Sequence, residues 1–212
     1  MTFITLEGGE GSGKTSQAKI LQQYLSDCNI KSIITKEPGG TVLADQLRSL
    51  LLSKEIKDAA TEFALLTAAR RDHVMNLIRP KLAEGFVVIC DRFLDSSLVY
   101  QGFVKGLDME MMMRVHQYLV GDITPDITFL LDIDPEISTK RLRNNDRVFN
   151  HYDASGIEFH KKIREGFLKI SERFSSRVVV INAGESSDNV AFQIRFHIDK
   201  IVNLNEIDSK NA

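Results

Sequence analysis

A segment near the start of the chain has the residue types and spacing of a phosphate-binding loop. It reads GGEGSGKT, fits the pattern G-x-x-x-x-G-K-[ST], and lies between an apolar run at residues 3–6 and a stretch with helical apolar spacing. In such a strand–loop–helix unit the backbone N–H groups converge on one point, and the helix N-terminus adds partial positive charge there. The segment comprises Gly8, Gly9, Glu10, Gly11, Ser12, Gly13, Lys14 and Thr15.

This loop, a P-loop, predicts a nucleotide site in which its last two residues have distinct tasks. Lys14 would contact the β- and γ-phosphates of the nucleotide, and the hydroxyl of Thr15 would bind Mg²⁺. A glycine-rich turn without a ligand is the alternative. The flanking strand and helix patterns argue against that alternative, because they are the context that phosphate binding requires.

The composition is that of a globular protein of moderate size. At 212 residues, with 43% hydrophobic and 26% charged residues, the chain suits one α/β domain with a full core. The net charge of −2 indicates no basic surface for nucleic acid. The two cysteines fit a reducing compartment, and neither a signal peptide nor a membrane-spanning apolar run is visible. We therefore expect a cytoplasmic protein that binds neither nucleic acid nor a membrane.

Strand-like and helix-like segments alternate along the chain, which is typical of a parallel sheet covered on both faces. We predict strands at residues 3–6, 31–35, 86–90, 127–132 and 177–182. After the P-loop helix we predict helices at about 42–52, 60–84 with a break or kink at Pro80, 108–120, 136–142, 157–174 and 189–202. The expected fold class is α/β, a P-loop NTPase-type three-layer sandwich with a five-stranded parallel sheet and a short lid. One P-loop domain would span residues 1–205, with the lid at about 143–156 and a flexible tail at 206–212.

Arginines at three positions could lie at the ligand edge of this sheet. Arg70 shares a helical stripe with Leu66, so its guanidinium must either find a buried acceptor or extend along the core to solvent. Arg92 follows Asp91 at the carboxyl end of a buried strand, where open α/β sheets bind ligands. Arg48 and Arg92 together would suit a second phosphate, whereas either one alone would more commonly be a surface charge.

Further blocks of sequence resemble a known family. The segments Glu37–Thr41 (EPGGT), Ala68–Arg70 (AAR) and Asp91–Gly102 (DRFLDSSLVYQG) closely resemble, in order and spacing, those of bacterial thymidylate kinases. The resemblance runs from about Thr2 to Phe196, and its first and last blocks are more specific than the P-loop. It implies transfer of the γ-phosphoryl group of ATP to dTMP, giving dTDP and ADP, with Mg²⁺ and in a homodimer.

The resemblance also implies how dTMP would be bound. Arg48 and Arg92 would hold its phosphate. Arg70, Gln101 and Ser97 would contact the thymine ring. The full set of dTMP-binding residues is Glu10, Glu37, Arg48, Leu66, Arg70, Arg92, Ser97, Tyr100 and Gln101.

Other matching positions concern the sugar, the metal and ATP. The resemblance implies that Glu10 faces the sugar 3′-hydroxyl and that Tyr100 crowds out a 2′-hydroxyl. Asp91 stands at the position of the acid near the metal, so Thr15 and Asp91 form the expected Mg²⁺ site. Arg141 resembles an arginine that packs on adenine, which adds it to the P-loop residues as an expected ATP contact.

The chain departs from the family pattern at Leu66 and His151. Leu66 stands where relatives usually carry a phenylalanine that stacks on thymine, so stacking must weaken or come from elsewhere. His151 stands in the lid segment where relatives commonly carry an arginine. Arg147 is the first candidate to replace that arginine, and Arg143 is the second. The predicted catalytic residues are Lys14, Arg92, Glu10 and Arg147.

Other functions remain open from the residues themselves. The nearest enzymatic alternative is a kinase for another nucleoside monophosphate. A P-loop GTPase is disfavoured, because the sequence contains no Asn-Lys-x-Asp segment to bind guanine. A non-catalytic nucleotide sensor on the same fold is the alternative from another class, and the intact Lys14, Thr15 and Asp91 argue against it.

The lid assignment gives a testable prediction. An arginine that stabilises the transferring phosphoryl group can contribute about 10³–10⁵ in rate, whereas histidine, with an unperturbed pKa of about 6.5, is mostly neutral above pH 7. Arg147→Ala should therefore lower kcat by more than about 100-fold, or about 2.7 kcal/mol, while Arg143→Ala and His151→Ala stay near wild type. Kinetics with both substrates saturating measure this. A wild-type rate for Arg147→Ala beside a crippled His151→Ala would assign the role to the histidine.

Overall fold

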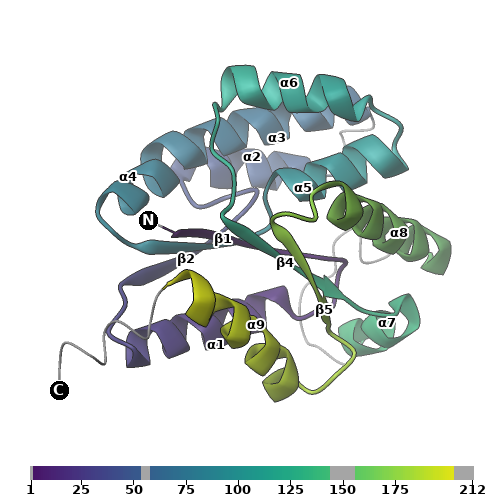
Figure 1. The fold of residues 1–212 in the computed structure, drawn as a ribbon. Helices are drawn as coiled ribbons and strands as arrows, with labels where there is room; N and C mark the ends of the chain where they lie inside the picture. Colours follow the sequence, from purple (N-terminus) through teal and green to yellow (C-terminus); the bar gives the residue numbers. More distant parts are fainter. Residues whose placement is uncertain (1, 54–57, 144–155, 203–212) are drawn as a thin grey trace, which may run out of the picture.

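A five-stranded parallel sheet lies at the centre of the molecule (Figure 1). The computed structural model describes residues 2–53, 58–143 and 156–202. The strands, in the spatial order β2-β3-β1-β4-β5, are β1 (Thr2–Glu7), β2 (Ser32–Lys36), β3 (Val87–Asp91), β4 (Ile127–Asp132) and β5 (Val178–Asn182). The central strands are apolar along nearly their whole length, as expected for a parallel sheet buried on both faces.

The pairing of the central strand fixes where the polar ends of the strands meet. β1 pairs in parallel with β3 on one side and with β4 on the other, so that Leu6 lies opposite Asp91 and Glu7 opposite Leu130. The P-loop, which leaves β1 after Glu7, therefore starts beside the charged end of β3. This is the edge at which parallel α/β sheets bind ligands.

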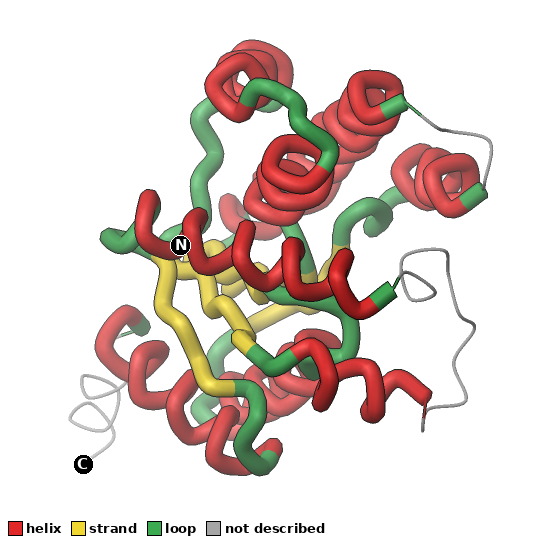
Figure 2. The backbone as a smooth tube through the Cα atoms, turned by 90° about the vertical axis from the view of Figure 1, so that its right-hand side faces the viewer, coloured by secondary structure: helices red, strands yellow, loops and turns green. Residues whose placement is uncertain are grey.

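Helices cover both faces of the sheet, as Figures 1 and 2 show. They are α1 (Lys14–Asp27), α2 (Val42–Leu52), α3 (Ala59–His73), α4 (Arg79–Ala83), α5 (Leu94–Ser97), α6 (Met109–Leu119), α7 (Pro135–Arg143), α8 (Ile157–Arg173) and α9 (Ser187–Ile201), with π-helical turns η1 (Val74–Ile78) and η2 (Leu98–Val104). Successive side chains of β1 point to opposite faces of the sheet. Ile4 and Leu6 pack with residues of α1 and α9, whereas Phe3 packs with Val74 and Ile78 of η1.

The predicted fold class is confirmed, and the observed strands begin and end within one residue of the predicted limits. The helix predicted over residues 60–84 is instead divided into α3, η1 and α4. Pro80 lies in the first turn of α4 and has no N–H to donate, which accounts for a wider turn just before it. Helices α5 and η2 were not predicted, because buried polar residues interrupt the apolar pattern of residues 94–104.

The predicted boundaries of the domain, lid and tail fall largely on residues outside those described, and they stay predictions. Within the described ranges, no helix is both long enough and apolar enough to cross a lipid bilayer. Asp108 caps the start of α6, since its carboxylate accepts the backbone N–H groups of Glu110 and Met111.

The packing of the sheet predicts a contrast between two phenylalanines. Phe129 of β4 is fully buried at 0% exposure, whereas Phe192 on α9 is 70% exposed. Phe129→Ala should lower the free energy of unfolding by about 3–5 kcal/mol, because it removes a buried ring and leaves a cavity. Phe192→Ala should change it by less than about 0.5 kcal/mol. Urea unfolding followed by circular dichroism measures both, and equal losses would contradict this packing.

Candidate active site

A cavity of about 960 Å³ opens at the carboxyl edge of the sheet. It lies among the P-loop, the turn after β2, α3, the segment after β3 and the start of α9. The residues predicted to bind dTMP all line it, namely Glu10, Glu37, Arg48, Leu66, Arg70, Arg92, Ser97, Tyr100 and Gln101. The expected ATP and metal residues that line it are Glu10, Gly11, Ser12, Gly13, Lys14, Thr15, Asp91 and Arg141. Gly8 and Gly9 instead border a second, much smaller cavity.

The P-loop closes around the ammonium group of Lys14. Its Nζ donates to the carbonyl oxygens of Gly8 at 3.1 Å and Gly9 at 2.8 Å. Only glycine suits the first of these positions, because Gly8 has φ 137° and a Cβ there would lie 2.6 Å from the carbonyl oxygen of Leu131. Burial, with a contribution from Arg92, lowers the pKa of Lys14 to about 8. An anion bound at this loop would favour the charged ammonium.

Thr15 and Asp91, the expected metal residues, lie in contact. Thr15 Oγ1 at the start of α1 donates to Asp91 Oδ2 at the end of β3, at 2.7 Å. Hydroxyl and carboxylate oxygens are ligands that suit Mg²⁺, which commonly takes one or two carboxylates together with waters and substrate phosphates. The residues present therefore fit the chemistry of the expected ion.

Arg92 is held between the P-loop and the segment after β3. Its Nη2 forms an ion pair with Glu10 Oε1 at 2.6 Å, and its Nη1 donates to the carbonyl oxygen of Gly8 and to Ser96 Oγ, each at 3.1 Å. Burial alone would lower the pKa of Arg92, but Glu10 and other nearby groups hold it above its usual range. Tyr100 Oη also donates to Glu10, at 3.4 Å. The ion pair therefore links the position of the Arg92 guanidinium to that of the Glu10 carboxylate.

A buried carboxylate fixes the backbone that presents Arg92. Arg92 itself has φ 73°, a left-handed conformation that is uncommon outside glycine. Glu7 Oε1 accepts the backbone N–H groups of Phe93 at 2.7 Å and Ser96 at 3.3 Å. Burial and the negative charge of Asp95 raise the pKa of Glu7 to about 7. Sequence reasoning missed Glu7, although an acid that ends an apolar strand just before a P-loop was a usable signal.

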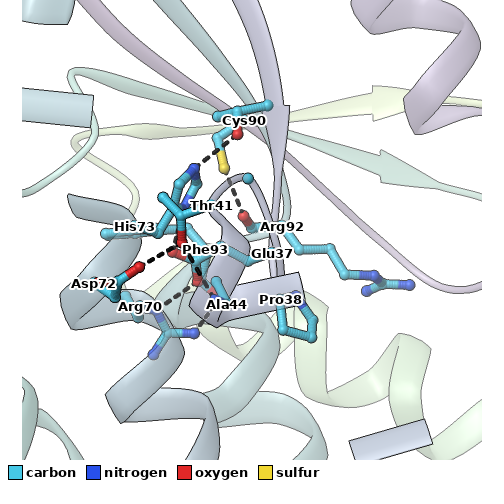
Figure 3. A network of polar contacts seen from close by, with 12 residues as sticks. Glu37, Pro38, Thr41, Ala44, Arg70, Asp72, His73, Cys90, Arg92 and Phe93 are labelled. Carbon is cyan, nitrogen blue, oxygen red and sulfur yellow. Dashed lines mark hydrogen bonds and ion pairs between the residues drawn. The ribbon is translucent and has the colours of Figure 1, made fainter. Parts of the chain in front are cut away.

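Arg70 lies in a buried polar network, shown in Figure 3. Its Nε donates to Glu37 Oε2 at 2.6 Å, and its Nη2 donates to Ser97 Oγ at 2.9 Å and to the carbonyl oxygen of Phe93 at 3.2 Å. Burial would raise the pKa of Glu37, but Arg70 and His73 hold it below its usual value. Arg70 is only 2% exposed. The alternative in which it extends to solvent is therefore wrong.

Gln101 is a further buried polar side chain that lines the cavity. Its Nε2 donates to Glu62 Oε2 at 2.9 Å, and the same oxygen accepts from Lys105 Nζ at 2.6 Å. Gln101 Oε1 and Arg70 Nη1 are buried and have no hydrogen-bond partner in the part of the chain that the structure describes. Sequence reasoning missed Glu62, whose spacing of eight residues from Arg70 places both on one face of α3.

Arg48 and Arg92, the pair expected to bind the phosphate of dTMP, lie close to one another. Arg48 Nη1 donates to the carbonyl oxygen of Pro38 at 2.9 Å. Burial, followed by the positive charge of Arg92, lowers the pKa of Arg48. Two guanidinium groups on one cavity wall can together hold an anion, which would relieve their repulsion.

The remaining predicted residues are Arg141 and Leu66, which line the cavity, and those of the predicted lid. Arg141 Nη1 donates to the carbonyl oxygen of Ala183 at 2.9 Å, just before α9. Leu66 lines the cavity, so an aliphatic side chain stands where the family pattern would place a phenylalanine. Arg147 and His151 lie outside the described residues, so the lid assignment stays a prediction.

Comparison with known proteins agrees with this geometry. A family model described as thymidylate kinase matches residues 6–194. The chain belongs to the thymidylate kinase family. A thymidylate kinase of Clostridium novyi (strain NT) is 44% identical over 196 residues, which cover 91% of this chain and 96% of that protein. One of Geobacillus sp. (strain WCH70) is 40% identical over 203 residues, covering 94% and 97%.

A solved thymidylate kinase structure supports the same assignment. The crystal structure of the enzyme from Ehrlichia chaffeensis matches with a TM-score of 0.77 and 32% sequence identity, covering 93% of this chain and 98% of that chain. The family resemblance inferred from the sequence motifs is thereby confirmed. The chain is a phosphotransferase of the P-loop type, on the fold expected for the thymidylate kinase family.

Glu7 gives a prediction about pH and stability. Its pKa of about 7 in the folded protein exceeds its ordinary value of 4.5, so between these pH values the folded state retains a proton that the unfolded state has released. Wild-type protein should therefore lose stability from this group as the pH rises from 5 to 8. Glu7→Gln, which does not titrate, should gain relative to wild type by more than about 1 kcal/mol over that range, since one pKa unit corresponds to about 1.4 kcal/mol.

Urea unfolding at pH 5 and pH 8 measures the difference between the two proteins. Glu158→Gln is the matched control, because the Glu158 side chain is 81% exposed and forms a surface ion pair with Lys161. Its difference from wild type should stay constant across the same range. If the difference for Glu7→Gln were also constant, Glu7 would not titrate as described.

Proposed function

We propose that the chain phosphorylates dTMP, using ATP as donor and giving dTDP and ADP. The observation that carries this proposal is the pair of unpartnered buried atoms among the described residues, the donor Arg70 Nη1 and the acceptor Gln101 Oε1. Thymine offers the complement, an O4 acceptor and an N3–H donor, whereas cytosine presents an amino group instead of O4. A buried polar group left unpaired costs about 1–3 kcal/mol. Thymine would relieve this cost and cytosine would not.

The charges on the cavity wall suit the transfer itself. Arg48 and Arg92 would hold the phosphate of dTMP, and Lys14 would contact the β- and γ-phosphates of ATP. A phosphate oxygen of dTMP attacks the γ-phosphorus, the bond from that phosphorus to the β–γ bridging oxygen breaks, and ADP leaves with the oxygen. The attacking phosphate has a second pKa near 6 and is already deprotonated at neutral pH, so no strong base is needed.

Thr15 and Asp91 would hold the Mg²⁺ ion that this reaction uses. When bound, the ion neutralises charge that develops on the β- and γ-phosphates. The Thr15 hydroxyl donates to Asp91, so these two oxygen ligands lie side by side. We further propose that Glu10 faces the 3′-hydroxyl of the sugar and that Tyr100 excludes a 2′-hydroxyl. The contact from Tyr100 Oη to Glu10 Oε1 supports a shared place at the sugar.

We also propose that the enzyme is a homodimer. Helices α2, α3 and α6 are neighbours on one side of the sheet (Figure 1), and Arg71 of α3 donates to the carbonyl oxygen of Leu119 in α6. Exposed apolar side chains include Val42 of α2, Met75 of η1, which continues α3, and Tyr118 and Leu119 of α6. Apolar groups gathered on one face favour a partner surface. Light scattering should give twice the mass of one chain, and a monomer at all micromolar concentrations would contradict the proposal.

The base-facing atoms predict the choice of acceptor. With ATP and Mg²⁺, kcat/KM should be highest for dTMP, lower for dUMP, which lacks the 5-methyl group, and negligible for purine monophosphates, because a purine leaves the buried polar groups unpaired. A coupled assay of ADP release against a panel of nucleoside monophosphates measures this, with Lys14→Met as a control for contaminating kinases. Equal turnover of AMP and dTMP would indicate a kinase for another monophosphate. Nucleotide binding without any turnover would indicate a sensor.

A further inference from the structure

Gln101 has an amide that could present either of its ends to a base. An oxygen at the ring would accept a hydrogen bond, whereas an NH₂ group there would donate one. Rotation of the amide by half a turn exchanges the two with almost no change in shape. The selection of a pyrimidine therefore depends on what fixes the orientation of this amide.

Glu62 is the group that fixes it. Its Oε2 accepts from Gln101 Nε2 at 2.9 Å, and both residues are buried, with exposures of 4% and 3%. An ionised carboxylate can only accept, so the NH₂ end of the amide must point toward it. Lys105 Nζ, which can only donate, pairs with the same oxygen at 2.6 Å. Gln101 Oε1 is then the end that remains, and no described residue binds it.

We propose that Glu62 is a specificity-determining residue, which selects against cytosine by holding Gln101 with its carbonyl oxygen toward the base. The N3–H of thymine or uracil donates to that oxygen, whereas the unprotonated N3 of cytosine would face it with a second acceptor. This inference rests on the proposed binding of a pyrimidine monophosphate in the cavity. It adds that Glu62 determines whether Gln101 accepts a hydrogen bond from the base or donates one to it.

A role in stability alone accounts less well for Glu62. Buried ion pairs cost desolvation, and apolar residues in their place are often neutral or stabilising. Glu62 also shares one face of α3 with Leu66 and Arg70, and all three line the cavity. A carboxylate placed on the wall of a binding site, with its oxygen on the amide of another lining residue, is positioned to orient that amide.

The test compares dUMP with dCMP, which differ only at the base edge that Gln101 and Arg70 would read. Glu62→Leu removes the acceptor and frees the amide to turn, so the ratio of kcat/KM for dUMP to that for dCMP should fall by about 10-fold or more. Arg70 can still only donate, so dUMP should remain the better substrate. The KM for ATP should not change.

Lys105→Met is the matched control within the same cluster. It removes the ion pair but leaves the carboxylate that accepts from Gln101, so the substrate ratio should stay within about twofold of wild type. Asp95→Asn controls for the loss of a buried ion pair elsewhere, since Asp95 binds Arg177 at 2.7 Å and does not line the cavity. Its ratio should also be unchanged.

A wild-type ratio in Glu62→Leu would overturn the inference, and so would an equal fall in Lys105→Met. If Glu62→Leu does not fold, the near-isosteric double variant Glu62→Gln with Lys105→Met replaces it. That variant leaves two amides that can pair in either sense, so its ratio should also fall. Turnover of dTMP by the wild-type enzyme tests the proposed function separately, so a failure of the inference leaves that result standing.

Discussion

The parallel pairing of β1 with β3 is the constraint on which the site depends. With Leu6 opposite Asp91, the P-loop and the Asp91–Arg92 segment leave the sheet side by side. The contacts between Thr15 and Asp91 and between Arg92 and Glu10 both join these neighbouring exits. A slip of one residue in the pairing would turn each strand side chain to the opposite face of the sheet and separate these partners. The side chains that meet at the edge of the cavity are therefore determined by strand register.

Around that edge lie buried ionisable groups, and burial disfavours their charged forms. The pKa of Lys14 is lowered and that of Glu7 is raised, both chiefly by desolvation. An anionic ligand would offset the desolvation penalty on Lys14, because it would place an opposite charge beside the ammonium group. The apolar layers packed against both faces of the sheet compensate for these costs. Stability and function are thus supplied by different parts of the same strands.

The sequence predicted the sheet well because its signals are local. Each strand is an apolar run bounded by polar residues, and the P-loop is a contiguous pattern whose spacing alone indicates its chemistry. The groups it missed act across the chain. Glu7 binds Ser96 from 89 residues away, and Gln101 binds Glu62 from 39 residues away. No periodic pattern marks such pairs, and the polar residues they require are what hid α5 and η2.

Arg70 and Gln101, the two residues proposed to face the base, are each backed by a buried carboxylate. Glu37 accepts from Arg70 Nε and Glu62 accepts from Gln101 Nε2, so each acid leaves its partner with one fixed free atom. The donor or acceptor character of these two free atoms is not fixed equally strongly, however. Arginine has only hydrogen-bond donors, so no neighbour can turn Arg70 into an acceptor. The amide of Gln101 has both a donor and an acceptor, and Glu62 determines which of them is left for the base. In the proposed binding mode, selection at O4 is thus intrinsic to Arg70, while selection at N3 is a property of the Gln101–Glu62 pair.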